Sequence, residues 1–132
     1  MASTLTIRDE TSSGESTGEL VLEFLTERIT VRELIRSRVY QEVQDHNLKA
    51  NQTVFRGLVQ PTDTERELNG YRLRQPRQID WQTQYDTALK SFEKNGFLVL
   101  VDDQQVDSLD DEIVITPETR ISFLKLVPLV GG

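Results

Sequence analysis

The chain has 132 residues, a formal net charge of −7 and no cysteine, and it is long enough for one hydrophobic core. The absence of cysteine excludes disulfides, thiolate metal ligands and a cysteine nucleophile. The negative charge argues against nonspecific binding to nucleic acid or to an anionic membrane, and no apolar stretch has the length of a membrane span. Because the N-terminus also lacks a signal-peptide pattern, we expect one cytoplasmic domain. We expect its partner proteins to bind it through basic surfaces.

The N-terminal pattern predicts two strands. Apolar and polar residues alternate around Leu5 and Ile7, which indicates a short strand with one face in the core. Residues 11–18 are small and polar and include two glycines, so we expect a flexible connection there. A second strand follows, and the two should form an antiparallel hairpin. Its core-facing positions are Leu20, Leu22 and Phe24.

After the second strand, the spacing of apolar residues changes from every second residue to about every 3.6 residues, which predicts a helix over residues 31–46. Thr30 and Glu33 have the spacing of a capping box at its start. His46 is the only histidine, and we expect it to be a solvated residue at the helix end rather than a catalytic or metal-ligating group. The apolar face consists of Val31, Leu34, Ile35, Val39 and Val43.

Residues 47–80 have no long period, because glycine, proline and asparagine interrupt them. We expect a single short ordered piece there, over residues 54–59. The segment is the one locally basic part of an acidic chain, so its arginines are either solvent-facing side chains or a specific binding patch. These arginines are Arg66, Arg72, Arg74 and Arg77.

A second helix should begin at Trp81, with Asp80 as its N-cap and Asn95-Gly96 as its stop. The apolar run at 97–101 predicts a central strand buried on both faces. A turn at Asp103-Gln104 should lead into a short strand around Val106, which would leave a sheet edge open for self-pairing.

The C-terminal third combines an acidic connection, a final strand and a diglycine. Residues 102–118 carry seven acids and no base, which indicates either solubility or a docking face for a basic partner. The apolar run at 121–127 predicts a buried strand, and Pro128 and Gly131-Gly132 follow it. Two glycines alone are equally compatible with a frayed end or a cloning remnant.

The order of these elements resembles the β-grasp fold. Residues 97–132 are similar to the closing segment of the small sulfur-carrier proteins of molybdopterin and thiamin biosynthesis, and more distantly to ubiquitin. The resemblance implies an α+β fold in which a mixed sheet wraps one principal helix over residues 1–132. It departs from the family pattern at 47–95, where this chain has an insertion with an extra helix. The matching positions are Phe97 to Val101, Val106, Leu109, Asp111-Glu112, Ile121 to Val127, Pro128 and Gly131-Gly132, and helix residues Ile29 to Ile35.

The resemblance also implies a substrate role for the tail, residues 128–132. In these families an activating enzyme uses ATP to adenylate the terminal carboxylate, here that of Gly132. Gly131 and Gly132 suit a narrow channel because they have no side chains. The chain is then not an enzyme and binds no cofactor or metal itself, since catalysis belongs to the partner. The docking residues of the tail would be Leu126, Pro128, Leu129 and Val130.

Three functions remain open at this stage. A bacterial ubiquitin-like modifier would be joined by an isopeptide bond to target lysines, with a conjugating enzyme and a deconjugating protease as further partners; the long insertion favours this. A sulfur carrier would form a C-terminal thiocarboxylate, and the uncharged PLVGG ending favours that. A noncatalytic β-grasp interaction module is the third. Lysines that could carry chains of a modifier are Lys49, Lys90, Lys94 and Lys125.

Overall fold

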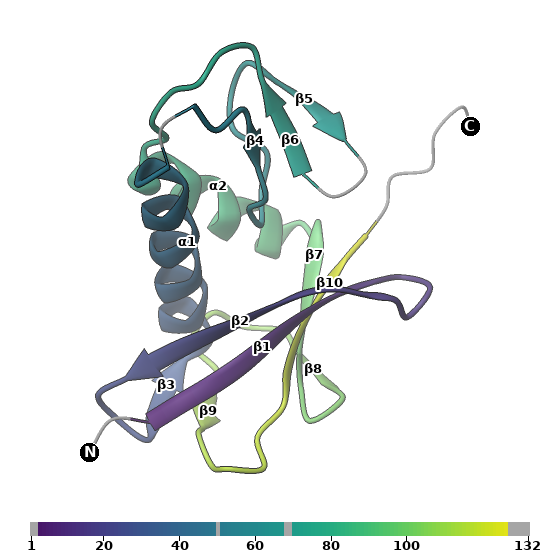
Figure 1. The fold of residues 1–132 in the computed structure, drawn as a ribbon. Coiled ribbons are helices and arrows are strands. Elements are labelled where there is room, and N and C mark those ends of the chain that lie inside the picture. The colour runs from purple at the N-terminus through teal and green to yellow at the C-terminus, as the bar shows by residue number, and fades with distance from the viewer. Residues whose placement is uncertain (1–2, 50, 68–69, 127–132) are drawn as a thin grey trace. The chain divides into compact units, whose positions relative to one another are not determined.

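The structure, a computed structural model, describes residues 3–49, 51–67 and 70–126 and has a mixed α+β fold (Figure 1). The chain divides into two compact units, and both points of division fall within helices. The first unit comprises residues 1–34 and 92–132, and the second comprises residues 35–91. The insertion expected at 47–95 overlaps the second unit, which begins earlier, inside the first helix.

The first unit is built on a five-stranded mixed sheet in the order β2-β1-β10-β7-β8. Strands β1 and β10 are parallel neighbours, and every other adjacent pair is antiparallel. The last strand along the chain therefore lies in the middle of the sheet. The bounds are β1 Ser3–Thr11, β2 Ser16–Phe24, β7 Phe97–Val101, β8 Gln104–Val106 and β10 Ile121–Lys125.

Alternation along these strands produces one buried face, as the sequence pattern predicts. Phe123 is fully buried, and its ring centroid lies 5.8 Å from that of Phe97 on the neighbouring strand. The prediction that residues 97–101 are buried on both faces is wrong, because Leu98 and Leu100 are only half-buried. The buried residues of the five-stranded sheet are Leu5, Ile7, Leu22, Phe24, Phe97, Val99, Ile121 and Phe123.

The hairpin between β1 and β2 is tighter than the sequence suggests. Both strands extend into the polar segment, so only residues 12–15 connect them. The Thr11 amide donates to the Glu15 carbonyl at 2.8 Å, and the Gly14 amide donates to the Thr11 carbonyl at 2.9 Å. Gly14 has a φ of 88°, which a residue without Cβ adopts at no steric cost. The expected flexible connection over 11–18 is therefore wrong in its extent.

A two-stranded antiparallel sheet, β3 (Arg28–Thr30) with β9 (Glu112–Val114), also belongs to the first unit. Ile29 pairs with Ile113, and both side chains are buried. We did not predict either strand, because three residues are too few to show a period of two. The acidic stretch at 102–118, in which the sequence predicts a connection before the final strand, thus also contains strand β9.

The second unit contains most of helix α1 (Val31–Asn47), most of helix α2 (Trp81–Glu93) and a three-stranded antiparallel sheet. The predicted helices are confirmed, but the prediction of one short ordered piece between them is wrong. The sheet has the order β4-β6-β5, with Phe55 paired to Tyr71. Its strands are β4 Val54–Phe55, β5 Thr64–Glu67 and β6 Gly70–Leu73.

Local signals at the ends of α2 and β7 are largely correct. Asp80 Oδ2 accepts hydrogen bonds from the Thr83 amide at 3.4 Å and from the Thr83 hydroxyl at 2.6 Å, as an N-cap does. Asn95, which ends the helical turn, has a φ of 60°. The turn after β7 lies at Asp102-Asp103, both with positive φ, and not at Asp103-Gln104.

Candidate functional site

The candidate site is the end of the chain, which follows the central strand of the sheet in sequence. β10 is paired on both sides, with β1 and with β7. Leu126 follows directly and is 42% exposed, so it remains available to a partner. The other predicted docking residues, Pro128, Leu129 and Val130, and the predicted activation residues Gly131 and Gly132 lie outside the described residues.

Strand β10 is held at the sheet by polar contacts near its start and at its end, as well as by packing. Lys125 Nζ lies 3.8 Å from Asp9 Oδ2 on β1, and both side chains are partly shielded from solvent. The Ser122 hydroxyl lies 3.4 Å from Glu10 Oε1 on the same neighbouring strand. These contacts hold β10 against β1.

Three leucines line the other face of this part of the sheet. Leu124 pairs with Leu98, and Ser122 pairs with Leu100, so alternation places all three leucines on the face opposite Phe123. Each leucine is half-buried. The sequence pattern did not reveal this face, since an uninterrupted apolar run gives no alternation to read.

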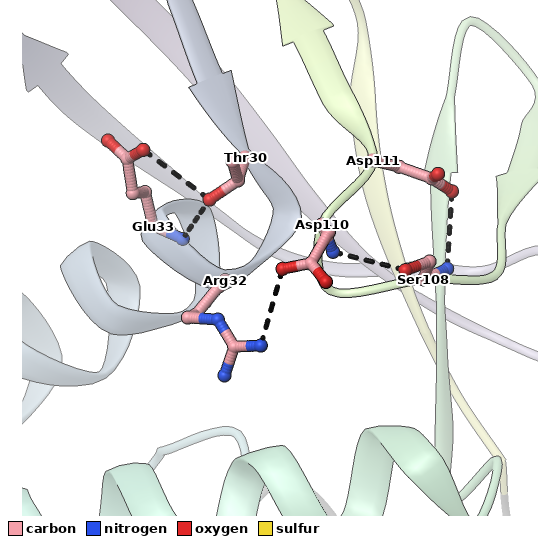
Figure 2. A network of polar contacts seen from close by, with 6 residues as sticks. All are labelled: Thr30, Arg32, Glu33, Ser108, Asp110 and Asp111. Atoms are coloured by element: carbon pink, nitrogen blue, oxygen red, sulfur yellow. Dashed lines mark hydrogen bonds and ion pairs between the residues drawn. The ribbon is translucent and has the colours of Figure 1, made fainter.

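The acidic connection, 107–112, makes polar contacts within itself and with Arg32 in the first turn of helix α1 (Figure 2). Asp111 Oδ2 accepts hydrogen bonds from the amides of Asp107 at 3.3 Å and Ser108 at 3.2 Å, which closes the loop. Asp110 Oδ1 lies 3.4 Å from Arg32 Nη2. Much of the acidity here is thus used in local contacts.

The amino end of α1 is satisfied by protein groups. The amides of Val31 and Arg32 donate to the carbonyls of Asp111 and Leu109, each at 3.0 Å. The Glu33 amide donates to Thr30 Oγ1 at 3.1 Å, and the Thr30 hydroxyl lies 3.4 Å from Glu33 Oε1 (Figure 2). The predicted capping pair is confirmed, and this helix end is not an open anion site.

The four arginines of the predicted basic patch are exposed but do not share one face. Arg66 pairs with Tyr71 across β5 and β6, whereas Arg72 pairs with Glu65, so alternation places Arg66 and Arg72 on opposite faces. Arg72 also forms an ion pair with Glu67. An Arg77 guanidinium nitrogen donates to the Thr62 carbonyl. Arg74, like the other three, is exposed.

Tyr71 is the half-buried group beside Arg66. Burial raises the pKa of the Tyr71 phenol, and the charge of Arg66 partly opposes that shift. The phenol therefore stays neutral at physiological pH.

His46 is buried, and the prediction of a solvated histidine is wrong. It is 6% exposed, and its Nε2 lies 3.1 Å from the Arg77 carbonyl oxygen. Its ring meets the Phe55 ring edge-to-face at 5.4 Å. The neighbouring Asn47 exchanges two hydrogen bonds with the backbone of Ile79, at 2.8 and 2.9 Å. The end of α1 is thus fastened to the segment before α2.

The lysines that could accept a modifier are mostly accessible. Lys49, Lys90 and Lys94 are exposed, whereas Lys125 is partly shielded beside Asp9. Over residues 3–49, 51–67 and 70–126, no group of three acidic or histidine side chains is arranged to hold a metal ion. Neither helix in those ranges is long and apolar enough to cross a membrane.

Comparison with known proteins does not assign the chain to a family. No protein-family model matches the chain, and no curated protein sequence shows significant similarity to it.

Proposed function

We propose that the chain is a ubiquitin-like modifier with a β-grasp first unit, whose Gly132 carboxylate is adenylated by a partner enzyme. The observation that supports it best is the mixed sheet with β10 at its centre and Leu126 exposed beyond it. An antiparallel hairpin followed by a capped helix precedes that sheet's later strands, in the order that the β-grasp resemblance implies. A strand paired on both sides holds Leu126, which directly follows it, at a defined place, and this lowers the entropy lost when a partner binds that residue.

The proposed reaction requires a free carboxylate at Gly132, either encoded or exposed by a protease. The carboxylate oxygen attacks the α-phosphorus of ATP, forms an acyl-adenylate and releases pyrophosphate. A lysine amine of the target, directly or after a thioester step on a partner cysteine, attacks the acyl carbon, and AMP or the thiolate leaves. The product is an amide between Gly132 and the lysine.

The second unit favours a modifier over a minimal sulfur carrier. Residues 35–91 form a compact body with its own three-stranded sheet, which adds surface for recognition by other proteins. The uncharged stretch from Leu126 to Gly132 favours the sulfur carrier as a second candidate. In that case a sulfur donor displaces AMP, and the tail gains a thiocarboxylate.

Pyrophosphate exchange tests the shared first step. The full chain is incubated with a candidate adenylating enzyme from the same organism, ATP and labelled pyrophosphate. We expect label to enter ATP with the intact chain and not with a chain that lacks Gly132. Two results would contradict the proposal. One is exchange that persists when Gly132 is deleted, and the other is no exchange with any candidate enzyme. Either result would favour a noncatalytic interaction module.

A further inference from the structure

The outer strand β2 has the length and the side chains of a site for strand addition. It is nine residues long and lies at one edge of the five-stranded sheet, whereas β8 at the other edge has three residues (Figure 1). In the part of the chain that the structure describes, β1 is the only strand paired with β2. Proteins commonly keep edge strands short, because unpaired amide and carbonyl groups attract another strand. The unusual length of this unpaired edge therefore suggests that it has a binding function.

The exposed face of β2 carries an apolar residue between two acids. Leu22 and Phe24 point into the core, so alternation directs Val21 and Glu23 outward together with Glu19. Val21 is 58% exposed. A neighbouring strand on the open side would place its own side chains directly beside these three.

The charges on this face specify a basic partner. Arg8 on β1 pairs with Glu19 across the strands, with Nε 3.2 Å from Oε1. Glu23 faces the uncharged Thr4, and it has no ion pair with any residue that the structure describes. A strand added on the open side therefore stabilises the sheet most when cations lie beside Glu19 and Glu23 and a β-branched residue lies beside Val21.

The net charge of the first unit also favours a basic partner. Fifteen acidic and six basic side chains give the first unit a formal charge of −9, whereas seven acidic and nine basic side chains give the second unit +2, together the −7 of the chain. Antiparallel pairing of β2 with a second copy about Val21 would set Glu19 opposite Glu23, and like charges directly opposite destabilise a sheet. A second copy is thus a poor occupant.

We propose that β2 binds an extended segment of a partner protein as an additional strand, and that this segment has the pattern basic-x-β-branched-x-basic. Main-chain hydrogen bonds along the edge supply affinity, and the alternating side chains supply specificity. The proposal is independent of the tail chemistry, because it needs neither Gly132 nor an activating enzyme.

The test uses the full chain and two blocked peptides in an NMR titration of backbone amides. Ac-TKTVTKT-NH2 places both lysines and the valine on one face, whereas Ac-TTKVKTT-NH2 has the same composition with the lysines on the opposite face from the valine. We expect the first peptide to shift the amides of 16–24 and to bind about two- to fivefold more tightly than the second. The Glu23→Lys variant should weaken binding of the first peptide by a similar factor.

The test includes a matched variant and four outcomes that would contradict the proposal. Glu118→Lys changes the net charge equally at an exposed position in the same unit and should leave binding within about twofold. Equal binding of both peptides, or shifts centred on 107–118, would show only nonspecific charge attraction. No shifts at millimolar peptide, or a concentration-dependent dimer formed through 16–24, would overturn the proposal.

Discussion

The second unit contains a buried ion pair between two residues of helix α1. One of the two residues also binds the backbone of the segment after β4. Arg38 Nε lies 3.3 Å from Glu42 Oε2, and the two side chains are 3% and 9% exposed. Glu42 Oε1 also accepts a hydrogen bond from the Leu58 amide at 2.9 Å. Because charges this deeply buried are costly without an opposite charge, the pair matters most when one partner is removed.

Glu42→Gln should therefore destabilise the protein, although it preserves the shape of the side chain. We expect the free energy of unfolding to fall by about 3 kcal/mol, because the substitution removes the charge of one partner of a buried ion pair. Urea denaturation at neutral pH measures this. The control is Glu19→Gln, whose ion pair with Arg8 is more than half exposed on both sides and should change stability by at most about 1 kcal/mol. Equal effects of the two substitutions would contradict the account.

Gly57 is required by a neighbouring ring. A Cβ at Gly57 would lie 2.1 Å from Phe55 Cε2, and Phe55 is only 1% exposed. Gly57→Ala should therefore lower the free energy of unfolding by about 1–3 kcal/mol, because the buried ring must shift. A Cβ at Gly18 would meet no atom within 4 Å, so Gly18→Ala should change stability by about 0.5 kcal/mol or less in the same urea titration. A tolerated Gly57→Ala would show that Phe55 is free to move.

Helix α2 begins at a carboxylate whose protonation affects the helix. Hydrogen bonds from Thr83, chiefly from its hydroxyl, hold the pKa of Asp80 below its usual value. The stabilising contribution of this N-cap is thus complete above the unfolded-state pKa of about 4 and is lost as the pH falls through the lower folded-state pKa.

Asp80→Asn should retain a functional cap while removing the titrating group. We expect the variant to resemble the original protein at neutral pH and to lose less stability on acidification below about pH 4. Thermal unfolding followed by circular dichroism across that pH range measures the difference. Identical pH profiles for the two proteins would mean that the Asp80 hydrogen bonds contribute nothing to folding.

The elements that could be predicted from sequence are those with a local cause. The starts of α1 and α2 follow from Thr30 and Asp80, which interact with residues three positions later. β3 and β9 could not be predicted, because their pairing joins residues far apart in the chain and each strand is too short to show a period. His46 was misplaced for a related reason, since its partners Phe55 and Arg77 are remote in sequence.

The candidate site was only partly predictable. A buried strand at the C-terminal end was predicted, but the sequence pattern assigned the centre of the sheet to residues 97–101, whereas β10 occupies it. Leu126, the one proposed docking residue within the described ranges, is exposed. The arginines look like one patch in sequence, but strand pairing places Arg66 and Arg72 on opposite faces. The acids of 107–112 are exposed, as the sequence suggests, but the pairing of Asp110 with Arg32 could not be predicted, because the two residues are far apart in the chain.

At the scale of the whole molecule, we propose that Gly132 becomes covalently attached to lysines of other proteins. The second unit and the open edge of β2 would then serve recognition, and the tail would serve attachment. The chemistry leaves a defined mark, because trypsin cleaves after Lys125 and leaves residues 126–132 on any modified lysine.

The most direct test is mass spectrometry of tryptic peptides from the protein's own cells. If the chain is a modifier, we expect branched peptides in which LVPLVGG is joined through Gly132 to a lysine of another protein. We expect these peptides to disappear when Gly132 is deleted. A tail found only as free carboxylate, or only as a thiocarboxylate with the mass difference between sulfur and oxygen, would contradict a modifier. The thiocarboxylate result would establish the sulfur carrier in its place.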